Sequence, residues 1–208
     1  MLKTADYHNQ ERKIMQKKEI AIFSGSFNPI HAGHLILASY IGSFTQIDEV
    51  WLVVSPHNPL KEENGLLGEQ HRLEMVRSAL APYSNLAASD VEFHLPRPSY
   101  TVDTLDHLTA LYPEKRFTLI IGADNWNQLP LWKEHERLLG SYPMLIYPRL
   151  GEEVHIPNEL CDRVELLDAP LVEISSSFIR RSIREGRDMR AFVPERAYEL
   201  ILQNGWYR

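Results

Sequence analysis

Short apolar runs alternate with amphipathic stretches along most of this chain. The runs EIAIF (19–23) and VWLVV (50–54) are continuously apolar, which is typical of strands buried on both faces of a sheet. Similar runs predict further strands at RFTLII (116–121), MLIY (144–147) and RVELLD (163–168), with a weaker one near LAASDVEF (86–93). Apolar residues with helical spacing predict helices over 34–44, 69–80, 101–112, 131–139, 176–186 and 194–204.

Strands separated by helices indicate a parallel sheet that is covered on both faces. The predicted fold class is therefore α/β: a Rossmann-like, doubly wound parallel sheet with a helical C-terminal part. There is no internal repeat and no low-complexity linker, so we expect residues 19–208 to form a single domain. Residues 1–18 form a polar N-terminal extension that we expect to be flexible. It carries charge throughout and lacks the apolar core of a signal peptide.

The composition narrows the class of protein. A formal net charge of −6 argues against general nucleic-acid binding, because such a protein needs a broad basic surface. No apolar run approaches the length of a membrane span. The single cysteine, Cys161, excludes an intramolecular disulfide and is typical of a reducing compartment, so we expect a cytoplasmic protein. The sequence leaves open whether the chain forms a homo-oligomer.

Unusual residues follow the first predicted strand, in the stretch FSGSFNPIHAGH (23–34). Ligands of open parallel sheets bind beyond the carboxyl ends of the strands. Gly25 lets the backbone approach a ligand without a Cβ, and His31 and His34 lie on either side of a helix start. A helix start attracts phosphate, and two imidazoles on one face can donate hydrogen bonds to phosphate oxygens. The stretch therefore indicates phosphoryl or nucleotidyl transfer.

Two simpler interpretations of this stretch compete with that one. It is compatible with a tight turn that carries two surface histidines, or with half of a metal site. The metal interpretation is the weaker, because no third ligand lies nearby at the usual spacing. We therefore predict no metal site made by the protein.

A second phosphate site is predicted near the C-terminus, in EISSSFIRRSIREG (173–186). Serines at a helix start cap free N–H groups, but three in a row exceed what one cap needs. Arg180 lies three residues after Ser177 on one helix face, so hydroxyls, amides and a guanidinium converge there. Five arginines and only two acidic residues lie between Ser175 and Arg190, which suits a small polyphosphate better than a long duplex.

Both stretches resemble signatures of the nucleotidyltransferase superfamily. GSFNPIHAGH resembles its (G)xFxPxHxGH motif, and ISSSFIR resembles its ISSSxIR motif. The resemblance implies that His31 stabilises the transition state at the α-phosphate of ATP and that His34 helps to hold the phosphates. It also implies that Ser175, Ser177 and Arg180 hold the β- and γ-phosphates. The implied catalytic residues are His31, His34 and Arg180, and the implied ATP site also includes Gly25, Ser26 and Phe27.

Three middle stretches narrow the second substrate. PSYTVDTL places Thr101 at a helix N-cap, LIIGADNW places Gly122 and Asp124 after a strand, and LPLWKEHERLL places Trp132 at a helix start. Simple capping explains Thr101 and Asp124 equally well, and Trp132 is compatible with a core position. Together with VPERAYELI and the terminal GWYR, however, these stretches resemble the bacterial nicotinate-mononucleotide adenylyltransferases over residues 19–208.

This resemblance implies an acceptor site made by Asn28, Lys61, Thr101, Trp132 and Lys133. Thr101 and the backbone at Lys133 would hold the pyridine carboxylate and Trp132 would stack on the ring, while Gly122 and Asp124 would lie at the ATP site. Two departures from the family pattern affect this site. Leu60 stands where many relatives have a histidine. Arg149 lies in the stretch YPRLG (147–151), where relatives often have Arg-Pro-Gly, so we assign it no role.

The implied reaction is adenylyl transfer from ATP to nicotinate mononucleotide in NAD biosynthesis, with Mg²⁺ carried mainly by ATP and water. No nucleic acid or membrane is expected as a partner. A related nucleotidyltransferase that acts on nicotinamide mononucleotide or phosphopantetheine is the nearest alternative. A non-catalytic nucleotide-binding module and a zinc hydrolase that uses His31 and His34 are alternatives from other classes.

Overall fold

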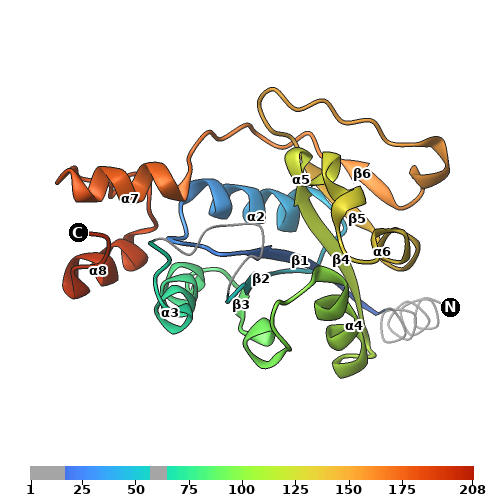
Figure 1. Cartoon of the computed structure of the whole chain (residues 1–208), viewed down its shortest axis with the longest axis horizontal. Coiled ribbons are helices and arrows are strands. Elements are labelled where there is room, and N and C mark those ends of the chain that lie inside the picture. Colours follow the sequence, from blue (N-terminus) through green and yellow to red (C-terminus); the bar gives the residue numbers. More distant parts are fainter. Residues whose placement is uncertain (1–16, 57–64) are drawn as a thin grey trace, which may run out of the picture.

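The computed structural model describes residues 17–56 and 65–208. Its core is a six-stranded, wholly parallel sheet with the strand order β3-β2-β1-β4-β5-β6. The strands are β1 (Lys18–Gly25), β2 (Glu49–Val54), β3 (Leu86–Ser89), β4 (Lys115–Gly122), β5 (Met144–Tyr147) and β6 (Val164–Leu166). All six predicted strands are present, and the predicted α/β, doubly wound fold class is confirmed (Figure 1).

Helices cover both faces of the sheet. The longer ones are α2 (Ala32–Phe44), α3 (Glu69–Leu80), α4 (Thr101–Leu111), α7 (Ser176–Arg184) and α8 (Glu195–Asn204). Shorter helices and 3-10 turns are η1 (Val91–His94), α5 (Ala123–Asn127), η2 (Leu129–Leu131), α6 (His135–Ser141) and η3 (Asn158–Leu160). None of the helices in the described ranges is long and apolar enough to cross a membrane.

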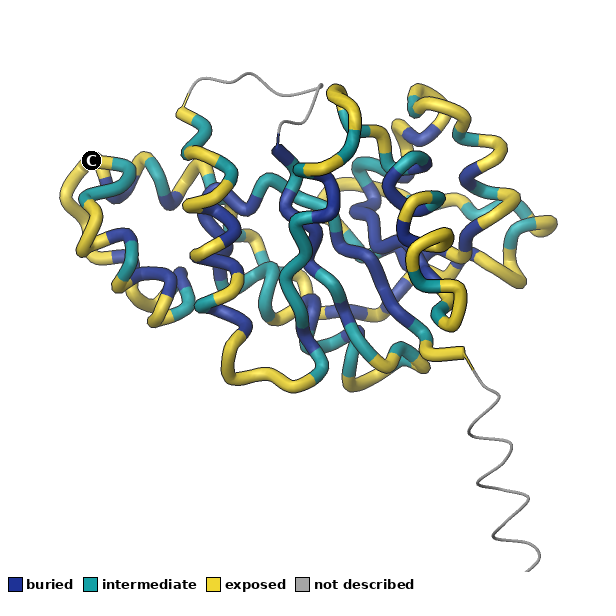
Figure 2. Tube along the Cα trace, turned by 90° about the horizontal axis from the view of Figure 1, so that it is seen from below, coloured by how far each residue is buried: buried dark blue, intermediate teal, exposed yellow. Residues whose placement is uncertain are grey.

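The alternation of side chains along each strand divides the core into two layers. Ala21 and Phe23 of β1 face a cluster completed by α2, α3, α7 and α8. Ile20 and Ile22 face a second cluster completed by α4, α5 and α6. Because both faces of the central strands are largely buried, these strands read as continuous apolar runs, and dark blue and teal predominate at the centre of Figure 2.

The strand order reverses between β1 and β4, which pair directly with each other. Chain segments that leave this point in opposite directions open a crevice at the carboxyl ends of the two strands. The segments after β1 and β4 are the ones in which sequence analysis found unusual residues.

Several local predictions were wrong by a few residues. Trp132 does not begin a helix: it follows η2 with extended backbone, and α6 starts at His135 because Glu134 has a left-handed conformation (φ 51°). Thr101 is not an N-cap but the first residue of α4, after Tyr100. The residues 91–94 after β3 form a 3-10 turn instead of extending the strand. The short helix α5 was not predicted.

Candidate active site at the sheet switch point

A cavity of about 390 Å³ lies at the carboxyl end of β1, where the strand order reverses. Segments that are far apart in sequence line it, among them the loop after β1 with the start of α2, the segment after β4, the segment after β5, and the stretch that leads into α7. Of the residues singled out from the sequence, its lining contains Gly25, Ser26, Phe27, Asn28, His31, His34, Asp124, Ser175, Ser177 and Arg180. The two predicted phosphate motifs therefore meet at one site.

The loop after β1 is tightly packed. Phe27 is buried with a left-handed backbone (φ 43°), a conformation that costs a non-glycine residue energy and that its surroundings must therefore hold. Its ring packs against Phe23 and His34. A Cβ on Gly25 would come within 3.1 Å of the Phe27 ring, so the glycine leaves room for this ring. The Asn28–Pro29 peptide bond is cis.

His31 and His34 form a stacked pair at the start of α2. Their ring centroids lie 3.6 Å apart with an angle of 21° between the planes. His31 is the N-cap residue, and its backbone N–H donates to Nδ1 of His34 at 3.2 Å. Since Nδ1 of His34 is an acceptor, a neutral His34 carries its proton on Nε2.

The His31 imidazole is neutral at pH 7. Burial, with a further contribution from the positive charge of Arg149, lowers the pKa of His31 from 6.5 to about 4. Its Nδ1 is buried and has no hydrogen-bond partner among residues 17–56 and 65–208. The side chain is therefore a neutral hydrogen-bonding group beside the cavity that it lines.

This pKa shift predicts that the protein loses stability on acidification. Between about pH 4 and pH 6.5 an unfolded chain protonates His31 while the folded protein does not, so the free energy of unfolding rises with pH in this window. The shift corresponds to about 3 kcal/mol when the whole window is crossed. Urea unfolding of the wild type and of His31→Gln across this window measures it. The variant is expected to lack this part of the pH dependence, and equal slopes would contradict the assignment.

The start of α7 supplies hydroxyls and a guanidinium. Ser175 is the N-cap, and its Oγ accepts from the N–H of Phe178 at 3.2 Å. Ser176 donates to the carbonyl of Pro29 at 2.9 Å, which ties α7 to the loop after β1. Arg180 donates to Ser177 Oγ at 3.3 Å and to the Asn28 carbonyl at 2.8 Å. The three serines thus have three roles: a helix cap, a tie to the first motif, and a partner of Arg180.

The remaining arginines of the C-terminal cluster take no part in this cavity. Arg187 pairs with Glu185, and Arg190 pairs with Asp188. Arg181 and Arg184 are exposed on α7 and do not line the cavity. Of the five arginines between Ser175 and Arg190, the cavity lining therefore contains Arg180 alone among the described residues.

Sequence analysis gave no role to Arg149, yet Arg149 lines the cavity. Its Nη2 donates to the hydroxyl of Tyr147 at 3.1 Å, and its Nε lies 3.6 Å from Oδ1 of Asp124. Because it lies two residues after the end of β5, it is a candidate under the rule that ligands bind at the carboxyl ends of strands. Gly122, at the end of β4, is not itself in the lining. A Cβ there would lie 2.3 Å from the Asp124 carboxylate, so the glycine lets this carboxylate fold back over it.

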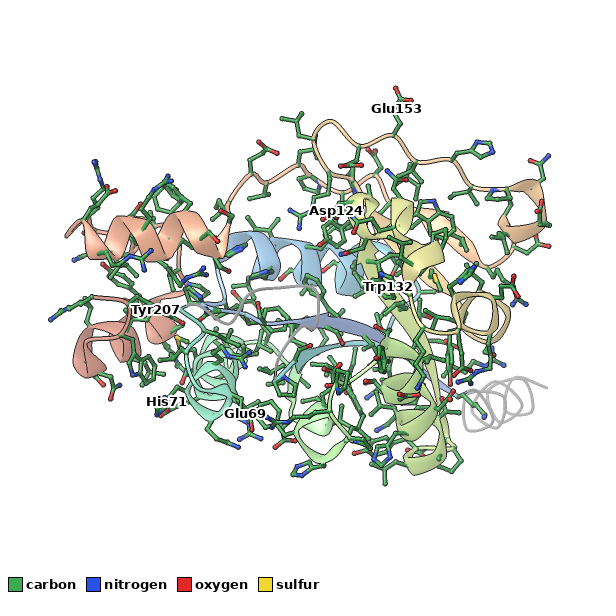
Figure 3. All side chains as sticks on the ribbon, in the orientation of Figure 1. Glu69, His71, Asp124, Trp132, Glu153 and Tyr207 are labelled. Atoms are coloured by element: carbon green, nitrogen blue, oxygen red, sulfur yellow. The ribbon has the colours of Figure 1, made fainter. Side chains whose placement is uncertain are left out.

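The predicted acceptor residues divide into two groups. Asn28 lines the cavity, but Thr101, Trp132 and Lys133 do not. Lys133 forms an ion pair with Asp103 at 2.9 Å and lies over the ring of Tyr100, which joins the segment after η2 to the start of α4. Trp132 is partly buried against the core layer of α4, α5 and α6 (Figure 3). Lys61 and Leu60 lie outside the described residues.

Comparison with known proteins agrees with this geometry. A cytidylyltransferase-like family model matches residues 22–182. A protein of Flavobacterium johnsoniae named "Probable nicotinate-nucleotide adenylyltransferase" is 43% identical over 191 residues, covering 91% of this chain and 99% of the relative. A protein of Bacteroides fragilis with the same name is 47% identical over 189 residues, covering 91% and 94%. The chain belongs to the nicotinate-nucleotide adenylyltransferase family.

A solved structure gives independent support for the fold of this family member. The nicotinic acid mononucleotide adenylyltransferase of Plasmodium falciparum, complexed with NaAD, superposes with a TM-score of 0.75 at 23% identity. The match covers 91% of this chain and 97% of the other. The family predicted from the sequence motifs is thus confirmed, and the roles of individual residues stay predictions.

The described residues contain no group of three or more His, Cys, Asp or Glu side chains that could hold a metal ion. In this adenylyltransferase family member, His31 and His34 stack on each other at the cavity and lack a third protein ligand for zinc within the described ranges. Their arrangement suits hydrogen bonding to an anion better than metal coordination.

Proposed function

We propose that this protein transfers the adenylyl group of ATP to nicotinate mononucleotide, giving deamido-NAD and pyrophosphate. An oxygen of the 5′-phosphate of nicotinate mononucleotide forms a bond to the α-phosphorus of ATP. The bond between that phosphorus and the oxygen bridging to the β-phosphate breaks, and the electron pair leaves with pyrophosphate. The attacking phosphate is already ionised, so no general base on the protein is needed.

One observation carries this proposal: the His31–His34 pair and the start of α7 meet at a single cavity in a member of this family. A helix start on each side, donors at His31 and His34, and the guanidinium of Arg180 together suit a chain of phosphates. In our proposal the imidazoles stabilise charge that develops at the α-phosphate. Arg180 and Ser177 hold the phosphates that leave as pyrophosphate.

Charges at the cavity support these roles. Arg149 and Arg180 both line it, so an anionic ligand gains attraction from two guanidinium groups. His31 contributes as a neutral donor, which costs less desolvation in a buried position than a cation would. Asp124 lies beside Arg149 at the end of β4, where we propose that its carboxylate accepts from ribose hydroxyls of the nucleotide.

The acceptor site is proposed next to the ATP site, at the start of α4. The ion pair between Lys133 and Asp103 holds Thr101 and Trp132 in neighbouring segments. Their backbone N–H groups would bind the pyridine carboxylate, and Trp132 would contact the ring. We also propose that Lys61 binds the phosphate of nicotinate mononucleotide.

We propose that Mg²⁺ enters with ATP, as part of the substrate. The described residues offer no carboxylate cluster that would hold the ion without the nucleotide. Bound to the phosphates, it would neutralise charge on the transferring group and on the leaving pyrophosphate. Cytoplasmic location and the absence of nucleic-acid partners stay predictions from composition.

The test is pyrophosphate release with ATP and Mg²⁺, with nicotinate mononucleotide, nicotinamide mononucleotide and phosphopantetheine compared as acceptors. We expect turnover on nicotinate mononucleotide to exceed that on the other two by at least about 10²-fold, since a site built for a carboxylate leaves polar groups unpaired with the wrong acceptor. Turnover mainly on another acceptor would leave the phosphate site in place and overturn the acceptor site. Binding of ATP without any turnover would favour a non-catalytic nucleotide-binding module.

A further inference from the structure

The last part of the chain holds the loop after β1 from several directions. Ser176 of α7 donates to the Pro29 carbonyl at 2.9 Å, and the N–H of Ala32, the first residue of α2, donates to the Phe192 carbonyl at 2.8 Å. Arg180 donates to the Asn28 carbonyl at 2.8 Å. Residues more than 140 positions downstream therefore fix the backbone that leads to His31.

Asn28, which accepts the Arg180 bond through its carbonyl, makes further contacts through its side chain. Its side-chain Nδ2 donates to the Gly65 carbonyl at 2.9 Å, and its Oδ1 accepts from the N–H of Leu67 at 3.3 Å. The same Oδ1 accepts from the hydroxyl of Tyr207 at 2.8 Å. The side chain is almost fully buried, with 4% exposure. Its polar atoms are thus committed to the protein, which favours a structural role over the acceptor binding expected from the sequence.

Tyr207, the penultimate residue, is placed for this bond by an unusual backbone. Its φ of 67° lies in the left-handed region, which costs a tyrosine about 1 kcal/mol or more and turns its ring into the protein. The ring lies where α7 and α3 approach the C-terminus (Figure 3), close to the charges of Arg180 and Arg72. Burial raises the pKa of Tyr207, so its hydroxyl keeps its proton and donates to Asn28.

We propose that Tyr207 is a positioning residue for the transfer reaction: its hydroxyl fixes the Asn28 side chain, and thereby the segment that carries His31 to the cavity. The inference rests on the proposed function, since it assigns a task within that reaction. Asn28 lies three residues before His31, and its own carbonyl binds Arg180 from the opposite motif. Loss of one bond at Asn28 therefore disturbs both sides of the phosphate site.

The test is Tyr207→Phe, which removes the hydroxyl and keeps the ring. We expect kcat to fall about five- to tenfold while KM for ATP changes less than about twofold, because a small displacement of a catalytic group lowers transition-state stabilisation more than ground-state binding. Asn28→Ala is expected to lower kcat at least as much. The double variant should be no slower than Asn28→Ala alone, because the two residues act through the same bond.

Tyr198→Phe is the matched control. Tyr198 is a buried tyrosine of α8 whose hydroxyl accepts from the N–H of Met189 at 3.1 Å, and it does not line the cavity. Its loss is expected to lower the melting temperature and to leave kcat per folded molecule unchanged. Assays run well below each variant's melting temperature, with circular dichroism to measure the folded fraction.

The outcomes separate this inference from the proposed function. Wild-type protein without turnover on nicotinate mononucleotide contradicts the function itself. An active wild type, with Tyr207→Phe equally active or with effects of Tyr207→Phe and Asn28→Ala that simply multiply, overturns the positioning role. A Tyr207→Phe variant whose only defect is a lower melting temperature, as for Tyr198→Phe, also overturns it.

Discussion

Replacing His31 by alanine is expected to lower turnover by about 10²–10³-fold with the fold retained, which is the usual cost of removing one donor to transition-state charge. His31 is buried at the cavity and stacked on His34, with an imidazole that is neutral at pH 7. Its contribution is therefore a directed hydrogen bond, not a diffuse positive charge. The measurement is steady-state pyrophosphate release with ATP and nicotinate mononucleotide, with kcat and KM determined separately.

His107→Ala is the matched control, because His107 is exposed on α4 and does not line the cavity. It should leave kcat unchanged. His31→Gln tests the chemistry further: an amide can donate a hydrogen bond but cannot titrate, so partial activity is expected, and any change of activity caused by protonation of His31 near pH 4 should be missing from its pH profile. A His31→Ala variant with near wild-type kcat would refute the role of His31.

The sequence was sufficient to predict the sheet and to locate the two motifs that meet at the cavity, for physical reasons. Strands buried on both faces must be apolar at nearly every position, so a run such as 116–121 can be recognised as a strand from the sequence. His31 and His34 lie within one short motif, and Ser177 and Arg180 lie within another. Each motif follows a feature, a strand end or a helix start, that can be recognised locally. Parallel topology then brings strand ends to one edge, which is why the two motifs could be expected to meet.

Features that depend on the backbone conformation of single residues, or on contacts between distant residues, could not be predicted from the sequence. The helix expected over 131–139 is interrupted because Trp132 is extended and Glu134 is left-handed, and no pattern of apolar residues records these changes. Tyr207 pairs with Asn28 across 179 positions, and a hydrogen bond at this separation leaves no periodic signal. Arg149 could have been found, since it lies two residues after the predicted strand 144–147.

Arg72 is an exception to the apolar pattern of its helix. It is a charged residue on the same helix face as Val76 and Ala79, which is the buried face of α3. The structure explains the exception: Arg72 is fully buried and donates to the carbonyls of Leu67, Ser26, Ser55 and Pro56. It thereby joins the segments that follow β1 and β2.

Arg72→Met is expected to lower the free energy of unfolding by about 3–5 kcal/mol, because it leaves several buried carbonyls without a donor while filling a similar volume. Urea unfolding followed by circular dichroism measures this loss. Arg72→Lys should restore little of it, since one ammonium group cannot reproduce the planar fork that reaches carbonyls on separate segments.

Arg77→Met is the control on the same helix. Arg77 is exposed and pairs with Asp90 at 3.2 Å, an exposed ion pair of the kind that contributes at most about 1 kcal/mol. If Arg72→Met cost no more than Arg77→Met, the carbonyls would have found water or new partners, and Arg72 would not hold the loops. A large loss at Arg72 together with lower kcat in the folded fraction would instead show that the loop after β1 needs Arg72 from one side as it needs Arg180 from the other.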